Sequence, residues 1–189
     1  MKRLADTALV LLFLPLWLPL ALLVAAAVAI TMGRPVLFAQ PRAGRGGRVF
    51  KFLKFRTMLP GDEPDSIRLT RTGRFLRATS LDELPQFFHV LTGKMAIVGP
   101  RPLPSRYLPR YSPEQARRHE VRPGITGWAQ INGRNSLSWD EKFRLDVWYV
   151  DNRTFLLDLK IILLTALKVV RRSGINASAS ETMSEFTGG

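Results

Sequence analysis

The sequence predicts an α+β fold: a small, mostly helical, membrane-associated domain with a short β element, preceded by an N-terminal re-entrant membrane helix that proline breaks. Three observations support this. An uncharged stretch runs from Ala8 to Ile30, an aromatic-rich segment follows at Val49 to Met58, and most later apolar residues recur at helical spacing. A length of 189 residues fits one compact domain with one appended element.

The N-terminal stretch has the length of a membrane segment, because its roughly 23 residues would reach about 34 Å as a straight helix. Lys2 and Arg3 precede it, and further basic residues follow it: Arg34, Arg42, Arg45 and Arg48. Since basic flanks favour the cytoplasmic side, both ends of the segment are drawn to the same face.

Two prolines offer a bend that satisfies both flanks. Pro19 has no N–H for the carbonyl of Pro15, and Pro15 leaves the carbonyl of Leu11 without a donor. We therefore predict a helix that breaks at Pro19 and enters and leaves by the cytoplasmic face. An ordinary span kinked by proline, and a signal peptide with Ala27-Val28-Ala29 at its cleavage site, are the alternatives.

The chain divides into three parts: a re-entrant membrane helix at 1–33, one body on the cytoplasmic face at 34–172, and a flexible tail at 173–189. Within the body, the segment from Val49 to Met58 predicts a strand with Phe50, Phe52, Lys54 and Arg56 on one face. Either a bulge near Leu53 turns the charges to water, or Lys54 and Arg56 project from an apolar face toward an anion. Ser138 and Glu141 have capping-box spacing, and Thr154 starts a second helix, from Phe155 to Arg172.

The charge of the chain indicates an anionic partner. Lys and Arg number 28 against 15 Asp and Glu, and there is no cysteine for disulfides, zinc thiolates or a thiol nucleophile. The basic surplus is concentrated between Arg34 and Arg77, beside the membrane segment, which favours lipid phosphate and phosphorylated substrates. Nucleic acid is disfavoured, because no helix-turn-helix, zinc or RNP pattern appears.

Two adjacent carboxylates, Asp82 and Glu83, follow a series of arginines repeated every three residues: Arg68, Arg71, Arg74 and Arg77. One interpretation is a helix cap, with either Asp82 or the Ser80–Glu83 pair at the start of a helix that ends near Gly93. The other is chemical: a carboxylate can attack phosphorus and form an acyl phosphate, provided that nearby cations neutralise the charge. We expect Arg77 to lower the pKa of Asp82 and keep it ionised.

A rigid arginine follows further along. Arg101 stands between Pro100 and Pro102, which confine its backbone, so its guanidinium suits bidentate phosphate binding. A simple proline-rich turn is the alternative. The loop from Arg122 to Arg134, with an Asn132-Gly133 turn, could line the same site.

Several motifs together resemble one family. The stretches "FKFLKFRTM", "GRFLRATSLDELPQFFHVLTGKMAIVGPRP", "RPGITGWAQINGRN" and "FRLDVWYVDN", behind a proline-broken apolar helix, strongly resemble the bacterial sugar transferases that are monotopic phosphoglycosyl transferases. The resemblance covers the chain to about Arg172. It implies transfer of a sugar 1-phosphate from a UDP-sugar to polyprenyl (undecaprenyl) phosphate, with release of UMP, at the cytoplasmic face of the bacterial inner membrane.

The resemblance also implies roles for particular residues. Asp82 and Glu83 match the family's catalytic dyad, with Asp82 as nucleophile in a two-step mechanism and Mg²⁺ as cofactor at these two carboxylates. Lys54, Arg77 and Arg101 match phosphate-binding or organising positions, and Pro19 matches the membrane-helix proline. His89 and His119 match no catalytic position, and we expect structural roles for them.

Two other functions remain open at this point. Asp82 could hold only Mg²⁺ while the lipid phosphate attacks directly, or the chain could be a non-enzymatic basic protein that binds anionic lipid or nucleic acid at a membrane surface. The sequence leaves the sugar and the oligomeric state open, a homodimer included.

Overall fold

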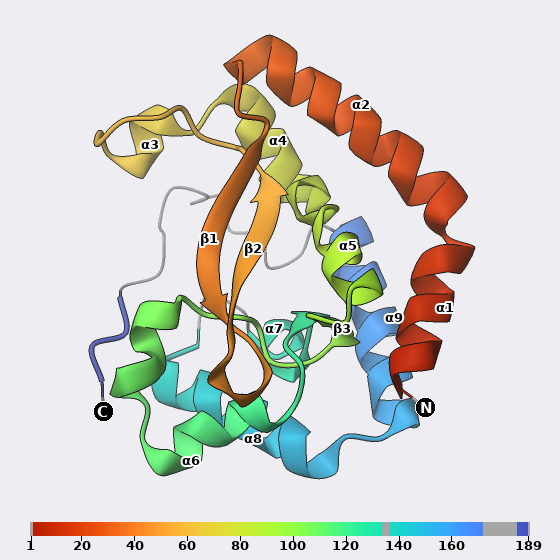
Figure 1. Cartoon of the computed structure of the whole chain (residues 1–189), viewed down its shortest axis with the longest axis vertical. Coiled ribbons are helices and arrows are strands. Elements are labelled where there is room, and N and C mark those ends of the chain that lie inside the picture. The colour runs from red at the N-terminus through yellow and green to blue at the C-terminus, as the bar shows by residue number, and fades with distance from the viewer. Residues whose placement is uncertain (1, 134–136, 172–184, 189) are drawn as a thin grey trace.

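The computed structural model describes residues 2–133, 137–171 and 185–188. The N-terminal apolar region forms two helices, α1 (Lys2–Leu12) and α2 (Leu14–Met32), which meet at an angle at the right of Figure 1. The interruption falls at Phe13, whereas Pro19 lies inside α2, so the predicted position of the break is wrong. Pro15 explains the difference: a proline ring disturbs the turn that precedes it, and Phe13 lies in the turn before Pro15.

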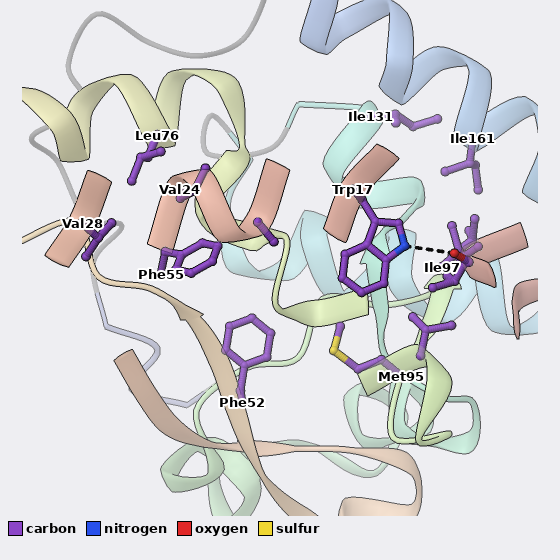
Figure 2. Close-up of a cluster of buried hydrophobic side chains, with 14 of the residues drawn as sticks. Trp17, Val24, Val28, Phe52, Phe55, Leu76, Met95, Ile97, Ile131 and Ile161 are labelled. Atoms are coloured by element: carbon purple, nitrogen blue, oxygen red, sulfur yellow. Dashed lines mark hydrogen bonds between the residues drawn. The ribbon is translucent and has the colours of Figure 1, made fainter. Parts of the chain in front are cut away.

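Helix α2 packs one side on the body and exposes the other. Its buried residues recur along that side: Trp17, Ala21, Val24, Val28 and Met32. Trp17 donates a hydrogen bond of 3.0 Å to the carbonyl of Val10, across the break between the two helices (Figure 2). Within the described residues, α2 is the one helix whose length and apolar composition are sufficient to cross a membrane. Large apolar side chains cover its outer side, among them Leu16, Leu22, Leu23 and Ile30.

A β-hairpin follows and occupies the middle of the view in Figure 1. Strand β1 (Leu37–Ala43) pairs antiparallel with β2 (Val49–Phe55) through a 3₁₀ turn at Arg45–Gly47. The predicted strand is confirmed but ends at Phe55 rather than Met58. Pairing is continuous from Leu37 with Phe55 to Ala43 with Val49, so the bulge suggested near Leu53 is wrong.

Short helices then carry the chain past the hairpin. They are α3 (Asp65–Arg68), α4 (Arg71–Thr79), a 3₁₀ turn (Leu81–Glu83) and α5 (Gln86–Leu91). Pro85 stands at the N-cap position of α5 and no side chain caps it, so neither Asp82 nor the Ser80–Glu83 pair has the capping role considered from the sequence. The acidic pair instead forms a separate turn between α4 and α5.

A second, two-stranded parallel sheet joins β3 (Ala96–Val98) to β4 (Gly124–Thr126). Around it lie α6 (Pro113–Ala116), α7 (Trp128–Ile131), α8 (Trp139–Asn152) and α9 (Phe155–Arg171), with 3₁₀ turns at Ser105–Arg110 and Arg117–Glu120. The capping box of Ser138 and Glu141 is present, and Thr154 accepts a hydrogen bond of 3.1 Å from the N–H of Leu157.

The main core joins the membrane-type helix to the body. Trp17, Val24 and Val28 of α2 meet Phe52 and Phe55 of β2, with further side chains from later elements: Leu76, Met95, Ile97, Ile131 and Ile161 (Figure 2). The N-terminal helices therefore fold against the hairpin and the later helices instead of standing apart from them.

A second, aromatic cluster includes the end of the chain. Phe186 is 3% exposed and packs against Tyr107, Tyr111, Trp139 and Phe143. The predicted flexible tail mostly falls on 173–184, which lie outside the described residues. Its last part differs from the prediction, because residues 185–188 dock on the body through Phe186.

Candidate active site

A left-handed residue places the acidic pair. Ser80 has φ 57° and ψ 18°, a conformation that costs a non-glycine residue about 1–2 kcal/mol. It ends α4 and begins the 3₁₀ turn Leu81–Glu83, so the backbone changes direction at this residue. Asp82 is consequently turned inward and is only 7% exposed.

The three predicted cations lie near Asp82. The charges of Lys54, Arg101 and Arg77, from β2, the loop after β3 and α4, each act to lower the pKa of Asp82, so all three are within electrostatic range of its carboxylate. Arg77 also donates a hydrogen bond of 3.1 Å from Nε to the hydroxyl of Thr57. Burial lowers the pKa of Lys54, an effect that the charge of Asp82 opposes.

The pKa of Asp82 nevertheless rises. Burial is the largest cause and the adjacent Glu83 is the second, and together they outweigh the three cations and raise the pKa to about 6. Arg77 does act to lower the pKa of Asp82, but the expected net decrease is wrong. The sequence did not reveal how deeply this carboxyl group is buried. At neutral pH the ionised form still predominates.

The two carboxylates have different environments. Glu83 forms an ion pair with Arg101, with 2.5 Å between Oε1 and Nη2. No hydrogen bond or ion pair to the carboxylate of Asp82 is found in the part of the chain that the structure describes. Glu83 is therefore engaged in holding the arginine, while the oxygens of Asp82 are available to a ligand.

A buried ion pair that the sequence reasoning missed supports Arg101. Arg118, 3% exposed, pairs with Asp146 at 2.6 Å and donates a hydrogen bond of 2.9 Å from the same Nη2 to the backbone carbonyl of Arg101. In the same loop, the carbonyl of Pro102 accepts a hydrogen bond of 2.9 Å from Arg42. The flanking prolines thus restrict the backbone conformation of Arg101, and the hydrogen bonds from Arg118 and Arg42 fix the position of this loop.

Arg56 does not face the site. The sequence placed it on one face of the strand with Lys54, but β2 ends at Phe55 and the alternation stops there. The guanidinium of Arg56 is buried at the end of α2, where it donates hydrogen bonds to the carbonyls of Met32, Gly33 and Arg34. A cation at the C-terminus of a helix also compensates its dipole.

The histidines and the loop from Arg122 also lie apart from Asp82. Nε2 of His89 accepts a hydrogen bond of 3.1 Å from the N–H of Leu53, and its ring packs on Phe50 and Phe52. The His119 ring packs on Tyr111. Arg122 donates a hydrogen bond of 3.0 Å to the carbonyl of Gly93, so this part of its loop faces the chain that follows α5.

Asp82 and Glu83 are also candidate metal ligands. No group of three or more His, Cys, Asp or Glu side chains able to hold a metal occurs in residues 2–133, 137–171 and 185–188. This donor set is nevertheless compatible with Mg²⁺, which commonly uses one or two carboxylates together with water and substrate phosphates. Asp82 fits this role best, because no side chain or backbone group among the described residues binds its oxygens.

The comparison with known proteins gives this arrangement a context. A family model described as bacterial sugar transferase matches residues 1–172. The chain belongs to the bacterial sugar transferase family. Its buried acidic pair and the surrounding cations all lie within the matched region.

Named relatives support the same family. The chain is 50% identical to an uncharacterised sugar transferase, EpsL, of Bacillus subtilis, over all of this chain and 96% of that protein. It is 42% identical to a UDP-glucose:undecaprenyl-phosphate glucose-1-phosphate transferase of Klebsiella pneumoniae, over 88% of this chain and 39% of the relative. An undecaprenyl-phosphate galactose phosphotransferase of Salmonella typhimurium is 39% identical over 75% of this chain and 35% of its own length. The chain thus spans about two-fifths or less of the last two relatives.

Proposed function

We propose that this bacterial sugar transferase transfers a sugar 1-phosphate from a UDP-sugar to undecaprenyl phosphate, forming a polyprenyl diphosphate sugar and UMP. The observation that carries the proposal is Asp82, a buried carboxylate that accepts no hydrogen bond and forms no ion pair within the described residues, amid the charges of Lys54, Arg77 and Arg101. The relatives named as UDP-glucose and galactose phosphotransferases support the choice of substrates.

The first step uses Asp82 as nucleophile. One carboxylate oxygen attacks the phosphorus that bears the sugar, the bond from that phosphorus to the bridging oxygen breaks, and UMP leaves with the electron pair. The product is an acyl phosphate on Asp82 that carries the sugar. Lys54, Arg77 and Arg101 offset the repulsion between the attacking carboxylate and the phosphate oxygens.

In the second step the lipid phosphate is the nucleophile and Asp82 is the leaving group. An oxygen of undecaprenyl phosphate attacks the same phosphorus, the bond to Asp82 breaks, and the carboxylate is restored. One phosphoanhydride replaces another, so the reaction needs no further energy source. Glu83 pairs with Arg101 at 2.5 Å, and the neighbouring ion pair of Arg118 and Asp146 supports the arginine's backbone.

Mg²⁺ at Asp82 and Glu83 would neutralise charge on the diphosphate of the bound nucleotide sugar. Glu83 would take part without leaving Arg101, because a carboxylate has lone pairs for more than one partner.

The apolar N-terminal helices suit a site that must meet a lipid-linked acceptor. We place the reaction at the cytoplasmic face of the inner membrane, with α1 and α2 entering and leaving by that face. The exposed apolar side of α2 and its packing on the hairpin that carries Lys54 support this arrangement.

Release of UMP from UDP-glucose and UDP-galactose, with undecaprenyl phosphate present, tests the proposal. The wild type should release UMP, and Asp82→Asn should reduce the rate by at least about 10³-fold while leaving the thermal midpoint within a few degrees of wild type. Unchanged turnover by Asp82→Asn would overturn the assignment of the nucleophile. If no UMP appears with any nucleotide sugar, the chain is not this transferase.

A trapping experiment separates the two-step reaction from direct attack by the lipid. Incubation with the UDP-sugar alone should add the mass of one sugar phosphate to the protein, and peptide mapping should place it on Asp82. Turnover without an adduct at any quench time would favour direct attack, with Asp82 holding only the metal.

A further inference from the structure

A groove of about 580 Å³ lies at the tip of the β1–β2 hairpin. Its walls come from the hairpin segment 44–50, from Gly93 and Lys94 after α5, and from Arg122 before β4. Small-molecule sites in proteins typically have volumes of about 300–1,000 Å³, so the groove is of ligand size.

The groove is distinct from the site at Asp82. Its lining reaches β2 only at Val49 and Phe50, whereas Lys54 lies four residues beyond Phe50 along the strand. Since a strand rises about 3.3 Å per residue, Phe50 and Lys54 are about 13 Å apart. The hairpin tip also points away from α4 in Figure 1. A ligand in the groove would leave the site at Asp82 open.

The charge of the groove is positive. Arg45, Arg48, Lys94 and Arg122 line it, and no carboxylate among the residues that the structure describes does. None of the four forms an ion pair in the described part of the chain. Asp6 of α1 interacts with Arg122 but does not line the groove. Like charges gathered in one groove repel one another, so an anion bound among them would be stabilised.

A fifth cation stands at the edge. The guanidinium of Arg3, in the first turn of α1, lies 3.2 Å from the position that a Cβ on Gly93 would occupy. Gly93 has φ 73°, and its carbonyl accepts the hydrogen bond from Arg122. The bare backbone at Gly93 therefore lets two guanidinium groups approach from different elements.

Two apolar side chains also line the groove. They are Val49 and Phe50, and Val49 is 56% exposed. Cations together with apolar side chains suit a phosphate attached to an apolar group better than a fully hydrated anion.

The position of Arg3 suggests the source of such a ligand. Arg3 belongs to the same helix as Leu4, Leu11 and Leu12, whose side chains are 50–74% exposed, and Leu16 at 69% continues this surface on α2. Under the proposed function these helices lie in the membrane. The groove then opens where lipid head groups lie, beside the start of α1.

We propose that this groove binds the phosphate of an anionic phospholipid head group and that its cations orient the domain on the membrane. The inference rests on the proposed membrane placement of α1 and α2, but not on the chemistry at Asp82. It assigns a function to Arg45, Arg48, Lys94 and Arg122, none of which has a role in the mechanism proposed above.

Calorimetric titration of the full chain in a non-ionic detergent tests the proposal. The probes are dihexanoyl phosphatidylglycerol, dihexanoyl phosphatidylcholine and inorganic phosphate, the two lipids below their micelle concentrations. The anionic lipid should bind at least about tenfold more tightly than the zwitterionic one, a difference of about 1.4 kcal/mol, and its affinity should fall with added salt.

Two variants with equal loss of charge provide the comparison. Arg45→Gln/Lys94→Gln should weaken binding of the anionic lipid at least about tenfold, whereas Lys51→Gln/Arg144→Gln, at exposed positions outside the groove, should stay within about twofold of wild type. Release of UMP by both variants in detergent should match wild type, which separates this test from that of the transferase activity.

Three results would overturn the proposal. Equal affinity for the two lipids would show that the groove does not select an anionic head group. Equal weakening by both double variants would show that net charge alone is responsible. Inorganic phosphate bound as tightly as the anionic lipid would assign the groove to soluble phosphates instead.

Discussion

Arg118 donates a hydrogen bond of 2.9 Å to the backbone carbonyl of Arg101, and the same guanidinium is held by Asp146 at 2.6 Å. Both members of this ion pair are buried, at 3% exposure each. A buried pair is costly to break, because the remaining charge has no partner, whereas replacing both members with apolar residues is often tolerated. This asymmetry allows the role of Arg118 in positioning Arg101 to be separated from its role in stability.

Arg118→Met should destabilise the fold by about 3–5 kcal/mol, since it leaves the charge of Asp146 buried alone. The double variant Arg118→Met/Asp146→Leu should recover most of that loss in a thermal melt. Its kcat should nevertheless remain at least about tenfold below wild type, because Arg101 lacks its backbone support. Recovery of both stability and kcat in the double variant would show that the pair has no positioning role.

Gly73→Ala should disturb the site from within α4. A Cβ on Gly73 would lie 1.8 Å from the carbonyl oxygen of Thr57, far inside contact distance, so α4 must move away from the chain that follows β2. Arg77 would then lose its 3.1 Å hydrogen bond to the Thr57 hydroxyl. We expect a destabilisation of about 1–3 kcal/mol and at least a tenfold loss of UMP release. Thr72→Ala, on the same helix, serves as control and should stay near wild type.

The sequence carried enough information to single out the acidic pair and the three cations that lie near it, because each lies in a short local motif. It also predicted β2, α5 and the capped helices, whose periodic or capping signals are local. Strand β1 was missed because it contains Pro41, which is unusual in strands away from sheet edges. Strands β3 and β4 have three residues each, too few for a periodic signal.

Other features depend on contacts between distant residues. Arg118 and Asp146 are 28 positions apart, and no local pattern links them. The burial that raises the pKa of Asp82 likewise comes from the folded surroundings. The helix break was placed at the wrong proline because the sequence shows two of them and does not show which turn gives way. Phe186 was predicted to belong to a flexible tail because its neighbours are rich in Ser, Ala and Thr. In the structure its ring packs in an aromatic cluster.

Ser80→Gly and Ser80→Val should have opposite effects. Glycine adopts positive φ without strain, so Ser80→Gly should retain activity and be as stable as wild type or slightly more so. Valine is β-branched and resists this conformation, so Ser80→Val should lose at least about 1–2 kcal/mol of stability. It should also reduce UMP release, because the turn that bears Asp82 begins at this residue. Equal activity in the two variants would show that the left-handed geometry does not position Asp82.

His119 should make the protein less stable in mild acid. Burial and the nearby charge of Arg118 lower its pKa to about 4, compared with about 6.5 for a free histidine. Between these values the unfolded chain binds the proton and the folded chain does not, so stability is present at pH 7 and is lost as pH falls. From pH 7 to 5.5 the loss from this group is about 1 kcal/mol.

Thermal midpoints across that pH range provide the measurement. His119→Gln should flatten the dependence, although it changes the midpoint at pH 7 as well. His89, whose pKa burial also lowers, should account for part of the remaining slope. A slope that is unchanged in His119→Gln would contradict the assignment.

Phe186→Ala should detach the end of the chain from the body. The Phe186 ring contacts Tyr107, Tyr111, Trp139 and Phe143, and Arg110 pairs with the adjacent Glu185 at 2.8 Å. Loss of a buried phenylalanine from such a cluster typically costs about 3 kcal/mol or more, but a terminal segment can detach without unfolding the rest, so we expect a loss of about 1–3 kcal/mol. Glu185→Gln removes only exposed ion pairs and should cost less than about 1 kcal/mol.

Limited proteolysis followed by mass measurement would show the detachment directly. In Phe186→Ala, cleavage near the C-terminus should become at least several-fold faster than in wild type and in Glu185→Gln, while the body stays intact. The same cleavage rate in all three proteins would mean that the Phe186 ring does not hold the end of the chain on the body. Faster cleavage in Phe186→Ala alone would show that the ring, and not the ion pairs of Glu185, holds the end of the chain, because an apolar side chain in a filled cluster outweighs pairs that water screens.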